Sequence, residues 1–201
     1  MPVASAVPAA RLAPVADADF PTRWAHFRLL GFEHNGESAL ALKLGDLAPR
    51  PPLLRIHSQC LTGDVFGSLR CDCRQQLELA LEAIAGEGAG LLIYEDKEGR
   101  GIGLMNKLRA YALQDAGADT VEANQRLGLA TDARDYTLPA AILHSLGVRR
   151  VRLLTNNPDK VAALERAGIQ VAERVPCRPE ALSPHARRYL QTKRAKLGHL
   201  R

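Results

Sequence analysis

Aromatic residues and long apolar runs are both scarce in this sequence. Phe, Trp and Tyr make up 4% of the 201 residues, and no apolar run approaches the roughly eighteen residues of a membrane-spanning helix. Proteins that bind single-stranded nucleic acid stack successive bases on aromatic side chains, and few are available here. The composition therefore predicts neither a membrane protein nor a nucleic-acid partner.

An export signal is also missing from the start of the chain. The first residues are rich in Ala, Pro and Val but are interrupted by Pro2, Pro8 and Pro14, and no basic leader precedes an apolar block. We interpret residues 1–18 as a disordered N-terminal tail. Without an export signal the protein is predicted to be cytoplasmic, where its thiols would stay reduced.

Positive charge is in modest excess. The 27 Lys and Arg residues outnumber the 22 Asp and Glu residues, which gives a net charge of +5 and a pI of about 9.2. Such a balance favours an anionic partner, such as a nucleotide, a nucleic acid or a membrane surface, without choosing among them. Basic residues are frequent near the end of the chain, where we predict a basic C-terminal tail over residues 177–201.

Strand-like and helix-like segments alternate along the chain. The last helix has Asn157 as a suitable N-cap, Pro158 at its first position and Gly168 at its end. This alternation predicts an α/β fold in one domain over residues 19–176, with a mixed β-sheet, helices packed on both of its faces and N-terminal antiparallel strands. Strands are predicted at residues 38–44, 53–58, 90–95, 149–156 and 169–175, and helices at residues 75–88, 103–117, 138–147 and 158–168.

Three of the four cysteines fall between Cys60 and Cys73, in the pattern C-x10-C-x-C with Cys71. A disulfide is disfavoured by the predicted compartment, and a bridge between Cys71 and Cys73 would close a very tight ring. Three thiolates with one position left open are typical of a catalytic zinc, whereas a structural zinc has four protein ligands. His57 could be a fourth ligand, and free thiols packed as small hydrophobic groups remain the simple alternative. Cys177 is interpreted as a bystander.

Two segments could bind an anion where a strand leads into a helix. Residues 96–103 carry alternating glycines around Glu98 and Arg100, and residues 155–160 place Thr155 and Lys160 beside the start of a helix. Free N–H groups at a helix start attract phosphate, and arginine suits phosphate or carboxylate. Glutamate suits the N–H edge of guanine. A plain strand-to-helix turn and a plain helix cap explain the same residues equally well.

Asp132 and Arg134 lie two residues apart in a polar segment. Such a pair is most often a surface ion pair that contributes little. It could also supply a base near a catalytic water and a clamp for phosphate. The spacing does not choose between these interpretations.

Together these segments resemble the GTP cyclohydrolase II family, which opens riboflavin biosynthesis. The motifs RIHSQCLTGDVFGSLRCDC and EGRGIG, in this order, are specific to that family. The resemblance covers about residues 20–175 without a large gap and makes residues 19–176 the catalytic domain. Its strongest segments are residues 55–73, 98–124, 132–136 and 153–161.

The resemblance implies a zinc-dependent hydrolysis of GTP to 2,5-diamino-6-ribosylamino-4(3H)-pyrimidinone 5′-phosphate, formate and pyrophosphate. One Zn²⁺ per chain would be held by Cys60, Cys71 and Cys73, and its water would attack C8 of the guanine. Pyrophosphate loss is attributed in this family to an arginine that attacks the α-phosphate, here Arg134, with Asp132 as proton acceptor. Since arginine normally stays protonated, its residue type alone favours a phosphate clamp. Mg²⁺ is expected with the triphosphate, and a homodimer is expected from the family.

Further site residues follow from the matching motifs. Tyr111 matches a family tyrosine associated with the second hydrolytic step, and relatives with methionine there stop at the formamidopyrimidine. Tyr111 therefore favours the full reaction. The residues implied to bind GTP are Arg55, Ile56, His57, Ser58, Gln59, Gln76, Glu98, Gly99, Arg100, Thr120, Thr155 and Lys160.

Some positions depart from the family pattern. Lys97 stands where glutamine is usual, Glu95 and Asp96 bring acidic groups to a place where arginine is common, and Gln59 replaces the glutamate of some relatives. These changes are expected to tune nucleotide affinity. Two other functions are kept as alternatives: a GTP cyclohydrolase that stops at the formamidopyrimidine, and a zinc-stabilised nucleic-acid-binding protein suggested by the basic pI.

Overall fold

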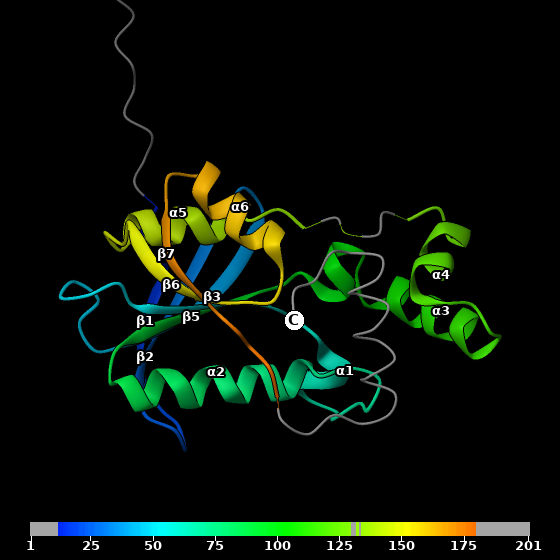
Figure 1. The fold of residues 1–201 in the computed structure, drawn as a ribbon, viewed down its shortest axis with the longest axis horizontal. Helices are drawn as coiled ribbons and strands as arrows, with labels where there is room; N and C mark the ends of the chain where they lie inside the picture. Colours follow the sequence, from blue (N-terminus) through cyan, green and yellow to red (C-terminus); the bar gives the residue numbers. More distant parts are fainter. Residues whose placement is uncertain (1–11, 130–131, 133, 180–201) are drawn as a thin grey trace, which may run out of the picture.

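A computed structural model describes residues 12–129, 132 and 134–179 (Figure 1). Most of the two predicted tails, which were assigned to residues 1–18 and 177–201, lies outside the described residues, because the structure does not describe residues 1–11 and 180–201. A first strand, β1, spans Ala16–Pro21, so the predicted N-terminal tail extends too far and residues 16–18 belong to the sheet. Every side chain of β1 is exposed, and backbone pairing with the next strand holds it in place without any burial pattern.

One seven-stranded sheet organises the fold, in the order β1-β2-β3-β5-β4-β6-β7. Strands β1, β2, β3 and β5 pair antiparallel, whereas β5, β4, β6 and β7 run parallel to one another. The predicted mixed sheet with N-terminal antiparallel strands is confirmed. After β1, the strands are β2 (His26–His34), β3 (Glu37–Leu44), β4 (Leu53–Ser58), β5 (Gly90–Glu95), β6 (Arg150–Leu154) and β7 (Gln170–Val175).

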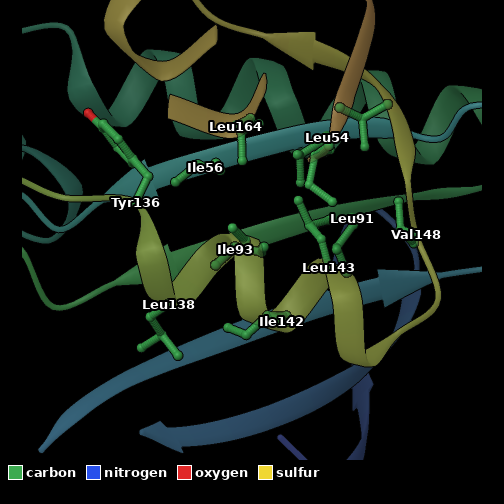
Figure 2. Packing of buried hydrophobic residues seen from close by; sticks show 14 of the residues in the cluster. Leu54, Ile56, Leu91, Ile93, Tyr136, Leu138, Ile142, Leu143, Val148 and Leu164 are labelled. Carbon is green, nitrogen blue, oxygen red and sulfur yellow. The ribbon is translucent and has the colours of Figure 1, made fainter. Parts of the chain in front are cut away.

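Helices cover both faces of the sheet, as predicted. Helix α2 (Cys73–Glu87) lies on one face, and α5 (Thr137–Ser145) and α6 (Pro158–Arg166) lie on the other (Figure 1). Figure 2 shows the hydrophobic core on the face covered by α5 and α6, in which residues of these helices pack onto Ile56 and Ile93 of the sheet. The short helices α1 (Leu61–Asp64), η1 (Glu98–Gly101), α3 (Leu104–Asp115) and α4 (Thr120–Arg126) extend to one side.

The carboxyl ends of the parallel strands bring the predicted motifs together. Strand β4 ends at Ser58 and leads into the cysteine loop, β5 ends at Glu95 and leads into η1, and β6 ends at Leu154 before α6. Because these strands are parallel, the segments that follow them lie at one edge of the sheet, where α/β proteins usually bind ligands. No helix among the described residues is long and apolar enough to cross a bilayer.

Candidate metal centre and active site

The three clustered cysteines converge. The thiol sulfurs of Cys60, Cys71 and Cys73 lie within 4.8 Å of one another. The Cys60 and Cys71 sulfurs are 3.7 Å apart. A tetrahedral zinc with Zn–S bonds of about 2.3 Å requires its sulfurs about 3.8 Å apart, so this pair fits zinc without rearrangement. No disulfide joins the cysteines, and Cys177 is buried outside the cluster.

Gly63 leaves room for the sulfurs. A Cβ added at Gly63 would lie 2.8 Å from the Cys71 sulfur and 3.1 Å from the Cys60 sulfur. Real Cβ atoms do not approach sulfur so closely, so a larger residue would push the thiols apart. The absence of a side chain at Gly63 leaves space beside the thiols, and this space fits an ion held among three sulfurs.

Gly63→Ala is therefore expected to weaken zinc binding by at least about tenfold, which is the usual size of an effect on the surroundings of metal ligands. The measurement is zinc retention in competition with a chelator. Gly86→Ala is the matched control, because a Cβ at that position in α2 meets nothing within 4 Å. It is expected to retain zinc and to raise stability by about 0.5–1 kcal/mol. Equal zinc affinity in both variants would contradict the role of Gly63.

Protonation of the cluster is uneven. Hydrogen bonds from Cys71 and Cys73, with the charge of Lys107, outweigh burial and lower the pKa of the Cys60 thiol. The shared hydrogen bond with Cys60 raises the pKa of Cys71 to about 11. Hydrogen bonds with Cys60 and Cys71 likewise raise the pKa of Cys73 well above its usual value. Since metals bind thiolates, binding at this cluster would displace protons and weaken as the pH falls.

Lys107 and Glu98 connect the cysteine loop to η1 and α3. The Lys107 Nζ donates to the Cys60 sulfur at 3.1 Å and to Glu98 Oε1 at 2.8 Å. Glu98 also accepts from the backbone N–H of Leu61 at 2.7 Å and from that of Gly99 at 2.9 Å. Both carboxylate oxygens are thus engaged within the protein. In this structure Glu98 fixes the position of the loop that carries the first cysteine.

Asp64 forms a second hub beneath the cysteine loop. Its carboxylate accepts from the Cys60 backbone N–H at 3.0 Å and from the Tyr94 hydroxyl at 2.8 Å. The His57 Nε2 lies 3.2 Å from the same carboxylate, and burial lowers the pKa of His57 despite that partner. His57 therefore orients the loop and is not among the clustered metal-ligating atoms of the described residues.

Arg55 and Gln76 lie on the α2 face of the sheet. Arg55 Nη2 donates to Gln76 Oε1 at 2.7 Å, and Gln76 Nε2 donates to Asp72 Oδ2 at 2.6 Å. Asp72 lies between two of the cysteines in the chain, so this series links β4 to the cysteine loop. Ile56, between Arg55 and His57, has its side chain in the core and offers only its backbone.

Arg134 and Asp132 form the ion pair that the sequence suggested. Arg134 Nε donates to Asp132 Oδ1 at 2.9 Å, and Nη2 donates to Oδ2. Arg134 Nη1 also reaches the Ser58 hydroxyl at 3.5 Å. Burial opposes ionisation of Asp132, but Arg134, with a smaller contribution from Arg100, outweighs it and lowers the pKa of Asp132. The pair thus lies at the end of β4 and within electrostatic range of η1.

Thr155 and Lys160 follow β6 at the same edge. Lys160 Nζ donates to the backbone carbonyl of Ile56 at 2.7 Å and lies 5.6 Å from the centre of the Tyr136 ring. The Thr155 hydroxyl accepts from the Asn157 N–H at 3.0 Å. Asn157 caps α6 through its side chain, as predicted. Both Thr155 and Lys160 are buried, which places a cation under the carboxyl ends of β4 and β6.

Tyr111 of α3 lies beside the cysteine loop. Its hydroxyl is 3.4 Å from the Thr62 hydroxyl, which is in turn 3.8 Å from the Cys60 sulfur. The Arg70 guanidinium packs over the Tyr111 ring at 4.7 Å. Arg70 also pairs with Asp115 at 2.5 Å. These contacts hold the hydroxyl of Tyr111 beside Thr62, whose own hydroxyl lies near the Cys60 sulfur of the thiol cluster.

The turn at Gly99 and Arg100 requires a left-handed backbone. Their φ angles are 62° and 64°. A Cβ at Gly99 would lie 2.9 Å from the Ile102 side chain, so glycine is needed there for space as well as for conformation. This turn borders a cleft of about 450 Å³ that is also lined by Gln59, Lys97 and Glu98. Thr120 begins α4, and its side chain lies outside what the structure describes.

Several residues that build this site have little recognisable signal in the sequence. Gly63, Asp64 and Thr62 lie within a motif already singled out, but spacing alone assigned them no contacts. Lys107 is separated from Cys60 by 47 positions, and nothing in the local pattern marks it as a thiol partner. Lys107 lies on the buried side of the amphipathic helix α3. A lysine at a position where the helical pattern calls for an apolar residue is the signal that the sequence offers.

A thiol triad at the carboxyl edge of a parallel sheet, beside buried cationic side chains, is typical of a metal-dependent enzyme that acts on an anionic substrate. The family model of GTP cyclohydrolase II matches residues 13–176. The chain belongs to the GTP cyclohydrolase II family. It is 57% identical over 189 residues to GTP cyclohydrolase-2 of Azotobacter vinelandii, which covers 92% of this chain and 90% of the relative.

Further relatives agree with this assignment. GTP cyclohydrolase-2 of Yersinia pestis is 55% identical, over 94% of this chain and 98% of its own. A riboflavin biosynthesis protein of Vibrio vulnificus is 54% identical over 92% of this chain and 51% of its own length. A solved two-domain 3,4-dihydroxy-2-butanone 4-phosphate synthase from A. baumannii has a TM-score of 0.49 and 16% identity, covering 86% of this chain and 42% of its own. A likeness that distant says nothing about activity.

Proposed function

We propose that this chain hydrolyses GTP to 2,5-diamino-6-ribosylamino-4(3H)-pyrimidinone 5′-phosphate, formate and pyrophosphate, as the first step of riboflavin biosynthesis. The observation that carries the proposal is the thiol triad, whose sulfurs lie within 4.8 Å of one another at the edge where the nucleotide motifs meet. Cys60, Cys71 and Cys73 would hold one zinc ion. When bound, zinc supplies a water of lowered pKa, suited to attack on C8 of guanine.

The guanine base is assigned to the cleft beside η1. Gln59, Lys97 and Glu98 line it, and both carboxylate oxygens of Glu98 are already engaged within the protein. The side-chain amide of Gln59 offers both a donor and an acceptor to the edge of the ring. Leu61, next to the first cysteine, lines the same cleft, which supports placing C8 on the side of the thiols.

The triphosphate is assigned to the cationic end of the site. Arg134, Lys160 and Arg100 gather where β4, β5 and β6 end, and Thr155 precedes the N-terminus of α6. Arg134 is proposed to bind the α-phosphate and to be needed for pyrophosphate release. Its ionised partner Asp132 stabilises the protonated guanidinium, which favours a clamp over a nucleophile. Mg²⁺ is proposed to enter with the phosphates, which are the ligands it prefers.

Tyr111 is proposed to serve the second hydrolytic step, which releases formate. Its position behind Thr62 and Cys60 supports this role, because a hydroxyl near the opened ring can donate to the formamide oxygen or position a water. The product would otherwise remain the formamidopyrimidine.

A cytoplasmic homodimer is proposed as the working state. Its support is a group of exposed apolar side chains on the cysteine loop and on α3, a type of surface that proteins usually cover. Sedimentation equilibrium of the purified chain measures this directly. These side chains are Val65, Phe66, Leu69, Met105 and Leu108.

One assay tests the reaction. With zinc-loaded protein and GTP, formate, pyrophosphate and the pyrimidine product are expected in equal amounts. Removal of zinc by a chelator is expected to abolish all three while circular dichroism shows the fold retained, since two large cores lie outside the cysteine loop. Loss of the fold on chelation, with no turnover of GTP beforehand, would favour a structural zinc instead. Pyrophosphate without formate would favour the formamidopyrimidine as product.

A further inference from the structure

Glu95 is a buried acidic residue for which the reaction outlined above has no use. It is the last residue of β5, is 1% exposed and pairs in register with Ser58 of β4. Alternate residues of a strand point to opposite faces, so Glu95 lies on the same face as Ile93. Ile93 packs in the core with Tyr136 and Leu164 (Figure 2). The carboxyl group of Glu95 therefore lies on the α5 and α6 side of the edge assigned to the triphosphate.

Both carboxyl oxygens of Glu95 are buried, and neither has a hydrogen-bond partner among the described residues. Buried polar atoms are almost always paired, because an unpaired one loses its interactions with water and gains nothing in return. An orphaned carboxyl group at the edge of a binding site thus calls for a partner that arrives with the ligand.

The titratable groups that face Glu95 come from three neighbouring segments. They are Lys160 from α6, Lys97 from the segment after β5, and Arg134, Asp135 and Tyr136 from the segment before α5. Each cation among them has another contact: Lys160 binds a backbone carbonyl, Lys97 binds Glu37 and Asp135, and Arg134 binds Asp132. Burial outweighs these cations and raises the pKa of Glu95 to about 7.

A carboxyl group in this state can act as a hydrogen-bond donor. Ionised, it would repel a phosphate brought in by Arg134 and Lys160. Protonated, it presents an O–H to a phosphoryl oxygen and satisfies its own unpaired position. The negative charge of the phosphate would further favour the protonated form.

We propose that Glu95 binds the triphosphate of GTP in its protonated form, donating a hydrogen bond to a phosphoryl oxygen and coupling nucleotide binding to proton uptake. This role rests on the proposed function, since it needs the triphosphate at this edge. Glu95 would then make nucleotide affinity depend on pH near neutrality.

Binding of 7-deazaguanosine triphosphate to zinc-loaded protein tests the proposal. This probe lacks the amidine of the five-membered ring, so it binds without turnover. Dissociation constants are measured at pH 6, 7 and 8 for the wild type and for Glu95→Gln, whose amide donates at every pH. The ratio of the wild-type constant to the Glu95→Gln constant is expected to rise about tenfold from pH 6 to pH 8, because the wild type must first take up a proton. Other titrating groups cancel in this ratio.

Calorimetry in buffers of different ionisation enthalpy gives a second measurement. At pH 8 the wild type is expected to take up close to one proton more than Glu95→Gln does on binding the probe. Glu82→Gln is the matched control, because it removes the same charge from an exposed position in α2. It should keep the wild-type proton uptake. Glu95→Ala avoids burying a new amide and provides the comparison if Glu95→Gln folds poorly.

A constant affinity ratio from pH 6 to pH 8, or equal proton uptake in the wild type and both Glu95 variants, would overturn the role of Glu95. Neither result would affect the proposed reaction if the wild type still yields formate and pyrophosphate from GTP. Absence of those products from the wild type would instead overturn the proposed reaction itself.

Discussion

Cys71→Ser is expected to lose zinc and to open the guanine ring about a thousandfold more slowly than the wild type, or not at all. A serine hydroxyl stays protonated where a thiol can ionise, and its oxygen is a poor substitute for sulfur at zinc. The cluster offers three sulfurs close to one another. Loss of one sulfur leaves two protein ligands, which is fewer than the three that hold a catalytic zinc. Zinc content per chain, measured together with formate, separates loss of metal from loss of chemistry.

Cys177→Ser is the matched control for that variant. Cys177 is also a buried free thiol, but it packs against α2, where its sulfur lies 3.7 Å from the Gln76 carbonyl. The same chemical change there is expected to leave zinc content and formate release close to wild type. A Cys71→Ser protein that kept one zinc and full activity would remove Cys71 from the ligand set.

Much of the fold could be predicted from local pattern. The strands β4 and β5 coincide with the predicted segments at 53–58 and 90–95, and both strands are buried on both faces. Strand β1 and helix α1 were missed for a physical reason. All side chains of β1 are exposed, and α1 has four residues, too few for any periodicity to appear.

The site divides in the same way. The thiol spacing predicted an open zinc site, because the number and the type of the ligands can be read directly from the sequence. The contacts that hold the site in place were not predictable, since Lys107 meets Cys60 and Arg134 meets Ser58 only through the tertiary fold. The orphaned state of Glu95 is likewise invisible in the sequence, which shows an acidic residue but neither its burial nor its lack of a partner.

Arg134→Ala is expected to slow pyrophosphate release by at least about a hundredfold while zinc content stays at one per chain. Arg134 is the cation that joins Asp132 to the end of β4 through Ser58, and no other side chain of the described site takes that position. The thiols and the cleft beside η1 are built from other residues, so ring opening should suffer less. The ratio of formate to pyrophosphate in one reaction is therefore expected to rise above one.

Arg126→Ala is the matched control, because Arg126 also pairs with a carboxylate, that of Glu122, but both of these side chains are exposed. Its formate and pyrophosphate should stay equal and near wild type. Arg134→Lys separates the two roles of Arg134, since a lysine keeps the charge of a clamp but loses the two-pronged contact with Asp132. Partial recovery of pyrophosphate release in Arg134→Lys, with no nucleotide attached to the wild-type protein by mass spectrometry, is the result expected of a clamp. A guanylylated Arg134 in the wild type would make it a nucleophile, and undiminished pyrophosphate release in Arg134→Ala would remove it from the reaction.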